Sequence, residues 1–383
     1  MNRIPITRPA LGPAETENVV RVVQSGWITQ GPEVAAFEKD FAAAVGAPHA
    51  VALSNCTVAI EVALRCLGVG PGDEVVTASH SFIATANAVV TVGARPVFAD
   101  IEADTYGLDP RAVAAAITPR TKAILAVHQI GIPCDLAGIA AVAGSLPIVE
   151  DAACAIGSEI EWQGRFERIG RPHGVVACFS LHPRKIVTTG DGGMITTADP
   201  ALAARVRLLR QHAMSVPDTV RHHSDKVVFE SYTEPAFNYR MTDLQAAVGR
   251  PQLARLDAIV AERRRLADRY REALADNPVL APPTERPNAR SNWQSYPTTL
   301  RPGARLGQVE VMQRLMDAGI ACKRGVANSH QEPAYVDRPE LWRGGPLPVS
   351  ERMRDTTVLL PLFHGMTAEE QDQVVAACQS LSH

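Results

Sequence analysis

Residues 49–78 read "HAVALSNCTVAIEVALRCLGVGPGDEVVTA", and this stretch indicates the type of fold. An apolar strand-like run comes first, followed by apolar residues at helical spacing that stop at Gly68. The turn "GPGD" then leads into a second strand-like run, "EVVTA". Such short connections between a strand, a helix and the next strand predict parallel strands that are covered by helices.

The same alternation continues to about residue 200. Further helices are predicted at residues 83–93 and 135–145, and further strands at residues 96–101, 123–128, 147–153, 175–181 and 194–197. The pattern predicts an α/β fold with an open, mostly parallel sheet that has helices on both faces. Ligands of such sheets bind at the carboxyl ends of the strands.

Beyond residue 240 the character of the sequence changes. Residues 244–274 are predicted to form one long charged helix with a kink at Pro251. Residues 277–291 are rich in proline and are predicted to link two domains. We therefore expect an N-terminal segment, a large domain, and a long linking helix with a small C-terminal domain, at residues 1–30, 31–250 and 251–383.

The bulk properties of the 383 residues are those of a soluble globular protein, with 46% hydrophobic and 21% charged residues. A net charge of −3 gives no reason to expect nucleic acid or an anionic membrane as a partner. No apolar run is as long as a signal-peptide core or a membrane span, so we expect a cytoplasmic protein. The seven scattered cysteines include no CxxC pair, so neither disulfides nor a metal are expected.

Polar residues follow two of the predicted strands. At Ser54 and Asn55 a strand gives way to a helix that begins near Thr57. The free N–H groups of such a helix start suit a phosphate, and a simple N-cap is the alternative. Asp151 ends an apolar strand, where a carboxylate must be paired or hydrogen-bonded. It either holds a protonated heterocyclic nitrogen or caps the turn that follows.

A single lysine, Lys185, lies in the stretch "CFSLHPRKIVTTGDGGMITT" at residues 178–197, between two strand-like runs. Most lysines are in solvent with only the stem packed. Lys185 follows Asp151 by thirty-four residues, and both follow the phosphate-type turn. Pyridoxal phosphate (PLP) chemistry needs these three features together: an anchor for the phosphate, an acid for the pyridine nitrogen and a lysine for the Schiff base.

The chain resembles the DegT/DnrJ/EryC1/StrS family of sugar aminotransferases, which are fold type I PLP enzymes. The resemblance covers almost the whole chain and rests on blocks such as "SGWITQGPEVAAFE", "SNCTVAIEVAL", "IVEDAACAIGS" and "FNYRMTDLQAAVG", which follow the family's order. It implies a large domain with a mostly parallel seven-stranded sheet flanked by helices, a smaller C-terminal α+β domain, and PLP as the cofactor of an aminotransferase.

The resemblance also implies roles for individual residues. Lys185 would form the Schiff base and carry the proton, which a lysine does best when burial and nearby positive charge lower its pKa. Asp151 would pair with the pyridine nitrogen, and Phe82 would stack on the ring unless it is an ordinary core residue. The phosphate would be held by the backbone at Cys56 and Thr57, by the Thr57 hydroxyl and by Ser180.

Further positions bear on assembly and on substrate contacts. Asn238 matches an asparagine that reaches the phosphate of the neighbouring subunit, which implies a homodimer with shared active sites; a turn asparagine is the alternative. Cys154 stands where the family usually has glutamine or histidine to contact the cofactor's ring oxygen, and a thiol is a poor hydrogen-bond partner. Substrate contacts, or else packing or salt-bridge residues, are expected at Trp27, Thr29, His182, Arg240 and His330.

The reaction implied is the transfer of an amino group from glutamate or glutamine to a keto sugar, expected to be nucleotide-linked, by a ping-pong mechanism. Its place would be amino-sugar, antibiotic or other secondary-metabolite biosynthesis. The alternative acceptor is a cyclitol, a nucleoside or another secondary-metabolite ketone. Related sugar dehydratases carry histidine in place of the Schiff-base lysine, whereas this chain has Lys185. A non-catalytic regulator would have lost the lysine, the aspartate or the phosphate residues, and all are present.

Overall fold

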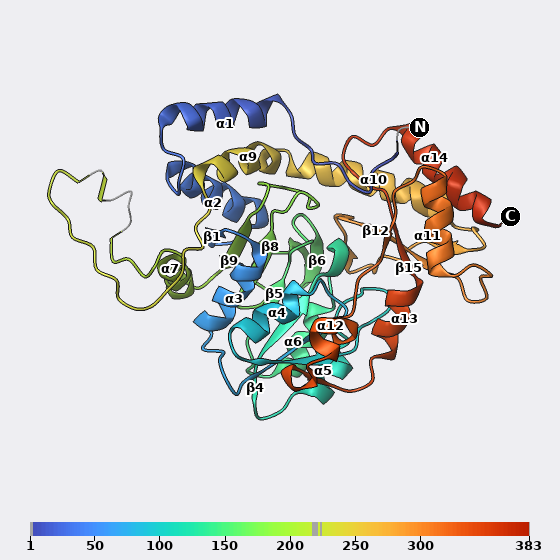
Figure 1. Ribbon diagram of the computed structural model, residues 1–383, viewed down its shortest axis with the longest axis horizontal. Helices are drawn as coiled ribbons and strands as arrows, with labels where there is room; N and C mark the ends of the chain where they lie inside the picture. Colours follow the sequence, from blue (N-terminus) through green and yellow to red (C-terminus); the bar gives the residue numbers. More distant parts are fainter. Residues whose placement is uncertain (1–2, 217–220, 223, 383) are drawn as a thin grey trace.

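A central eight-stranded sheet organises the computed structural model, which describes residues 3–216, 221–222 and 224–382 (Figure 1). Its strand order is β1-β9-β8-β5-β4-β2-β3-β14. In this order the strands span His49–Leu53, Gly193–Thr197, Val176–Ser180, Ile148–Asp151, Thr121–Val127, Glu74–Ala78, Arg95–Ala99 and Arg343–Gly344. β9 is antiparallel to both neighbours, and the other neighbouring pairs are parallel. The predicted α/β fold with a mostly parallel sheet is confirmed, and β14 adds an eighth strand to the seven expected.

Helices cover both faces of this sheet, because successive strand residues point to opposite faces. On one face, Val149 and Cys178 belong to a core that includes α3 (Cys56–Cys66), α4 (Ala84–Thr91) and α7 (Pro200–Leu209). On the other face, Ala126 and Phe179 belong to a core that includes α2 (Pro32–Val45), α5 (Pro110–Ala116), α6 (Leu136–Ala143) and α9 (Asp243–Ala254). Among the described residues, no helix is apolar over a length that would span a bilayer.

Polar side chains determine where several of these helices begin. The Asn55 side chain accepts a hydrogen bond from the Val58 N–H at 3.0 Å at the start of α3. Thr242 and Gln245 form a reciprocal capping box at the start of α9. The same kind of N-cap is made at α5, α6 and α7 by Asp109, Asp135 and Asp199.

The long helix expected at residues 244–274 is two helices, α9 and α10 (Leu256–Ala273). Pro251 lies inside α9, and the break comes at Arg255, whose φ of −102° and ψ of 7° are not helical. The prediction of a kink at Pro251 is therefore wrong about the position of the interruption. Proline removes only one N–H donor from the helix, and α9 continues past it to Ala254.

The C-terminal part of the chain forms a second, four-stranded sheet in the order β10-β12-β15-β13. These strands span Leu280–Ala281, Tyr296–Leu300, Thr357–Leu360 and Lys323–Arg324, and α11 (Gln308–Asp317) and α14 (Ala368–Gln379) belong to the same part. The proline-rich stretch at residues 277–291 forms two short strands in addition to connecting α10 with β12. It contributes β10 to this sheet and β11 (Ala289–Arg290) to a three-stranded sheet with β6 (Glu159–Trp162) and β7 (Arg165–Arg168).

The C-terminal part also returns to the central sheet. Asn328 makes an isolated β-bridge with His80, and β14 runs parallel to β3. Phe98 of β3 packs with Tyr335 and Trp342 beside this strand. The remaining elements are α1 (Pro13–Ser25), α12 (Pro333–Val336), α13 (Pro348–Thr356) and short 3₁₀ turns at Gln129–Gly131, Ser329–Gln331, Pro339–Leu341 and Ser380–Ser382.

Candidate active site

The candidate site lies at the carboxyl-terminal edge of the central sheet, where several strands end. β5 ends at Asp151 and β8 at Ser180, while the segments after β1 and β2 carry Thr57 and Phe82. β9 runs the other way, so its first residue, Gly193, pairs with the last residues of both β1 and β8. The topology thus gathers the residues predicted to hold the cofactor at one edge.

Asp151 is a buried carboxylate, with 5% of its surface exposed. Its Oδ2 accepts a hydrogen bond from the Thr85 hydroxyl at 2.7 Å, and its Oδ1 accepts one from the Ala153 N–H at 3.2 Å. Burial raises the pKa of Asp151 above its ordinary value, against the effect of these donors and of the nearby Lys185. No lysine or arginine of the described residues forms an ion pair with it, so the site suits a protonated ring nitrogen.

Lys185 is half-buried in the loop between β8 and β9, and its Nζ donates to the Cys154 sulfur at 3.0 Å. Burial lowers the pKa of Lys185, but its contacts with Cys154, Cys56 and Asp151 outweigh burial and raise the pKa above the ordinary lysine value. The expectation of a lowered pKa is therefore wrong for this arrangement. The physical reason is that Nζ donates a hydrogen bond to the Cys154 sulfur and lies near the Asp151 carboxylate, both of which favour the ammonium form.

The start of α3 offers an anion site. The Asn55 side chain takes the N–H of Val58, so the N-cap alternative holds for that residue. The first N–H groups of a helix have no partner within it, and here they belong to Cys56 and Thr57. A Cβ on Gly193 would lie 2.4 Å from the Asn55 carbonyl, so only glycine lets β9 approach this turn so closely. Burial raises the pKa of the Cys56 thiol well above its ordinary value, which leaves its backbone as the useful group.

Phe82 lies just before α4, with 73% of its surface exposed. The alternative that Phe82 is an ordinary core residue is therefore wrong. An uncovered aromatic face at a strand-end loop is suited to stacking on a planar ring. Together with the buried Asp151 and the start of α3, it gives the three kinds of contact that a pyridine phosphate needs.

The sequence profile of the DegT/DnrJ/EryC1/StrS aminotransferase family matches residues 9–379. This chain belongs to that family. The spore coat polysaccharide biosynthesis protein SpsC of Bacillus subtilis (strain 168) is 36% identical over 382 residues, which are 99% of this chain and 97% of SpsC.

Solved structures agree with this assignment. The aminotransferase TlmJ from Streptoalloteichus hindustanus has a TM-score of 0.88 at 33% identity, over 99% of this chain and 98% of TlmJ. The PLP form of Spr1654 from Streptococcus pneumoniae has a TM-score of 0.88 at 27% identity, over 99% of this chain and 98% of that one. The protein is a PLP-dependent aminotransferase.

The turn that carries Cys154 in this aminotransferase is fixed by a residue that the sequence did not suggest. Asn292 is fully buried, and its Nδ2 donates to the carbonyls of Cys154 and Ile156, each at 2.8 Å. Thr85, which bonds Asp151, was also missed. The position of Thr85 could have indicated its place in the site, because it follows Phe82 by three residues in the first turn of α4. No local sequence pattern indicates a role for Asn292.

His330 makes polar contacts within the protein, with Ser79 and Glu351, and is more than an apolar packing residue. Ser79 Oγ accepts the backbone N–H of His330 at 3.0 Å and lies 2.6 Å from its Nδ1. Ser79 Oγ and Nδ1 therefore share a hydrogen bond, and Nε2 lies 3.4 Å from Glu351 Oε1. Burial lowers the pKa of His330, against the effect of Glu351.

His182 is exposed, and its Nδ1 accepts the N–H of Arg184 at 3.2 Å. Burial of the ring and the charges of Lys185 and Arg184 lower the pKa of His182, while Asp191 opposes them. His182 therefore lies near Lys185. Ser180 lies two residues before it and is half-buried.

The other predicted contacts form separate groups in the aminotransferase. Asn238 is exposed, and its Oδ1 accepts from Arg240 Nε at 3.0 Å. Trp27 packs edge-on against the His222 ring at 5.2 Å between centroids. The Thr29 carbonyl accepts from the Asp243 N–H at 3.0 Å, at the start of α9. These contacts place Trp27 and Thr29 beside the arm that follows α7 and the start of α9, and they do not join either residue to Lys185.

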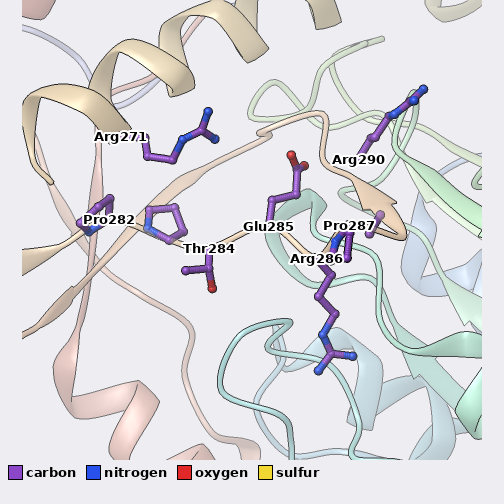
Figure 2. Close-up of a pocket in the computed structure, with 9 residues that line it drawn as sticks. Arg271, Pro282, Thr284, Glu285, Arg286, Pro287 and Arg290 are labelled. Carbon is purple, nitrogen blue, oxygen red and sulfur yellow. The ribbon is translucent and has the colours of Figure 1, made fainter.

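The proline-rich stretch lines a concavity of about 570 Å³, and Figure 2 shows the residues around it. Its arginines are engaged by carboxylates of the protein: Arg271 by Asp268 at 2.6 Å, Arg286 by Asp104 at 2.7 Å and Arg290 by Glu159 at 3.5 Å. None of the residues predicted for the cofactor lines it. Among the described residues, no cluster of His, Cys, Asp and Glu is arranged to hold a metal ion.

Proposed function

We propose that this aminotransferase transfers an amino group from glutamate or glutamine to a keto sugar, which we expect to be nucleotide-linked. The observation that carries the proposal is that Lys185 lies near the buried Asp151, which forms no ion pair with a lysine or arginine of the described residues, at one sheet edge. The likeness to SpsC, a polysaccharide biosynthesis protein, supports a sugar as acceptor. The corresponding process would be amino-sugar, antibiotic or other secondary-metabolite biosynthesis.

The residues present fit PLP. Asp151 would hold the ring nitrogen, Phe82 would cover a ring face and Lys185 would bind the aldehyde. The phosphate would be held by Ser180 and the start of α3 at Cys56 and Thr57. When bound, PLP supplies an aldehyde that takes up amino groups and a protonated ring that accepts electrons.

The chain's own groups then manage protons at this site. When it is not bound to the aldehyde, Lys185 Nζ in its neutral form would be the base that takes a proton from the substrate carbon and returns it, because it is the amine beside the proposed ring position. Asp151 keeps the ring nitrogen protonated through its carboxylate, which Thr85 holds in place at 2.7 Å. Donor and acceptor would use the same site in turn, which gives ping-pong kinetics.

We also propose that the enzyme is a cytoplasmic homodimer with shared active sites. Figure 1 shows that the described parts of the segment between α7 and α9 project from the rest of the fold. Val227 and Phe229 in this segment are 83% and 88% exposed, which is unusual for large apolar side chains unless a partner covers them. Asn238 lies near the base of the same segment. Seven free cysteines are consistent with a reducing compartment.

A second acceptor class is a cyclitol, a nucleoside or another secondary-metabolite ketone. The stretches "HQIGIPCDL" and "WQSYP" favour it, because they differ from the commonest sugar enzymes of the family. Cys154 at the lysine, in place of glutamine or histidine, is a further departure.

The test is the visible spectrum of the purified holoenzyme before and after glutamate or glutamine is added separately. We expect a cofactor band that one of these donors bleaches, and that is absent from Lys185→Ala. The bleached enzyme is then given keto sugars and cyclitols, and the compound that restores the band identifies the acceptor class. A band that neither donor bleaches would contradict the proposal, and light scattering of the same sample tests the dimer.

A further inference from the structure

The amine of Lys185 and the thiol of Cys154 are two reactive groups in direct contact. Nζ lies 3.0 Å from Sγ, and both side chains are half-buried. Among the described residues, no other lysine amine lies within hydrogen-bond distance of a cysteine sulfur. A partly exposed sulfur next to an ammonium group is the setting in which cysteines of proteins react.

The cysteines on two neighbouring elements, at the start of α3 and in β8, are protected by burial. Cys56 and Cys178 are both buried, and burial raises the pKa of each thiol well above its ordinary value. Oxidants react with the thiolate form of an accessible cysteine, so these two thiols are expected to be inert. Cys154 is therefore the cysteine of this region that an oxidant reaches.

We propose that Cys154 and Lys185 are a modification site, at which a peroxide joins the two side chains through a reversible S–N bond. A lysine in this bond has no free amine for the aldehyde of PLP, so the joined enzyme is expected to be inactive. That consequence rests on the proposed function, whereas the formation of the bond does not.

The bond forms in two steps. Hydrogen peroxide transfers an oxygen atom to the Cys154 sulfur, which gives a sulfenic acid and releases water. The neutral Lys185 amine then attacks that sulfur: the S–N bond forms, the S–O bond breaks, and the leaving hydroxide takes a proton from the nitrogen and departs as water. The sulfur loses two electrons and the peroxide gains them, so thiol, amine and peroxide give a sulfenamide and two water molecules.

The oxidation of the sulfur also prepares the amine for this attack. Burial lowers the pKa of Lys185, and Cys154 is the group that opposes burial most strongly. Conversion of the sulfur to a sulfenic acid removes its thiolate charge, so burial is then free to favour the neutral amine. The electrophile and the nucleophile therefore arise from the same event.

The backbones of both residues are held in place. Asn292 Nδ2 donates to the Cys154 carbonyl at 2.8 Å, and the Lys185 N–H donates to the His182 carbonyl at 2.8 Å. Side-chain rotation is therefore enough to bring sulfur and nitrogen together. Two groups held in contact in this way react far faster than the same groups free in solution.

The experiment treats the full-length enzyme with hydrogen peroxide, once freed of PLP and once with PLP bound, and maps the peptides by mass spectrometry. In the PLP-free sample the peptides of Cys154 and Lys185 should be joined and lighter than their sum by two hydrogen atoms. Bound PLP should suppress the link, because the aldehyde occupies the amine. Dithiothreitol should restore the separate peptides and the PLP binding lost on oxidation, because it reduces the S–N bond to thiol and amine and becomes a disulfide.

A variant and an internal control distinguish this link from unspecific oxidation. Lys185→Ala keeps the thiol but removes the amine, so its sulfenic acid should persist and be trapped at Cys154 by dimedone. Cys322 is also half-buried and directly precedes Lys323, but its sulfur donates to the Met312 carbonyl at 3.4 Å. No link between Cys322 and Lys323 is expected in the same sample.

Two results would overturn the inference: no joined peptide in the PLP-free wild type, or equal trapping of Cys154 by dimedone in the wild type and in Lys185→Ala. Bleaching of the cofactor band by donor is recorded on the holoenzyme before oxidation. If bleaching occurs but no link forms, only the modification site fails. If the link forms but no donor bleaches the band, the modification site stands and the proposed function fails.

Discussion

Lys185 Nζ and Cys154 Sγ lie 3.0 Å apart, so the lysine of this aminotransferase has a sulfur atom as its nearest hydrogen-bond acceptor. The contact contributes to the raised pKa of Lys185 and ties the lysine loop to the turn after β5. Glutamine or histidine at this position would offer the lysine an amide or a ring nitrogen instead. The raised pKa of Lys185 therefore depends in part on the cysteine that this chain has at position 154.

Replacing Cys154 with alanine should lower the pKa of Lys185, because burial would then act with less opposition. The pH dependence of acetylation by dilute acetic anhydride, read by mass spectrometry on cofactor-free protein, measures this. Cys154→Ala should shift the reaction profile of Lys185 to lower pH than in the wild type. An unchanged profile would mean that the sulfur does not influence the amine.

Asp151→Asn should remove a pH dependence of stability from the cofactor-free protein. Burial raises the folded pKa of Asp151, so its contribution to the free energy of unfolding is full below about pH 4 and is lost as pH rises through the raised pKa. The difference in unfolding free energy, wild type minus variant, should therefore fall as pH rises above about 4. Urea unfolding at several pH values gives it, and a difference that rises with pH would contradict the assignment.

Thr85→Val keeps the shape of the side chain but leaves Asp151 Oδ2 without its hydroxyl donor. We expect a loss of about 1–3 kcal/mol in the free energy of unfolding and weaker retention of PLP on dialysis. Thr91→Val is the matched control, because Thr91 ends the same helix in an exposed position and bonds only the Asn87 carbonyl. Equal effects of the two changes would remove Thr85 from the site.

Gly193→Ala should displace β9 from the start of α3, since the new methyl group would lie 2.4 Å from the Asn55 carbonyl. Backbone atoms cannot turn aside as a flexible side chain can, so we expect lower thermal stability and a large loss of PLP affinity. Gly70→Ala serves as the control, because nothing lies within 4 Å of a Cβ there. PLP titration by fluorescence and thermal unfolding distinguish the two variants; an alanine tolerated at 193 would refute the close approach.

Ser79→Ala should cost about 1–3 kcal/mol of unfolding free energy, because the N–H and Nδ1 of the half-buried His330 both lose their partner. A double-mutant cycle with His330→Leu isolates the contact of the two side chains. The coupling should be at least about 0.5 kcal/mol. Additive losses would show that Ser79 and His330 act independently.

The sequence was informative where the signal is local. Apolar runs located strands such as Ile148–Asp151, and the residue types at Asp151 and Lys185, with their spacing, indicated the cofactor chemistry. The interruption of the long helix was predicted at Pro251 instead of Arg255, because proline is the stronger local signal for a break in a helix. The proposed domain boundary at residue 250 falls inside α9, where hydrophobic periodicity has no reason to change.

Contacts between distant residues could not be predicted in this way. Ser79 and His330 are 251 positions apart, and no sequence pattern around either residue predicts a contact with the other. The same holds for Asn292, whose amide reaches Cys154 across 138 positions. The raised pKa of Lys185 depends on three groups that only the folded chain brings together.

Strand β14 has a consequence for how the chain is made. β3 obtains its outer neighbour only from Arg343 and Gly344, so during synthesis the edge of the central sheet stays open until nearly the whole chain has left the ribosome. An open strand edge is a template for pairing with other chains. A chain that stalls early, or a fragment cut near residue 250, is therefore expected to aggregate, and chaperones are expected to bind this edge until the C-terminal segment covers it.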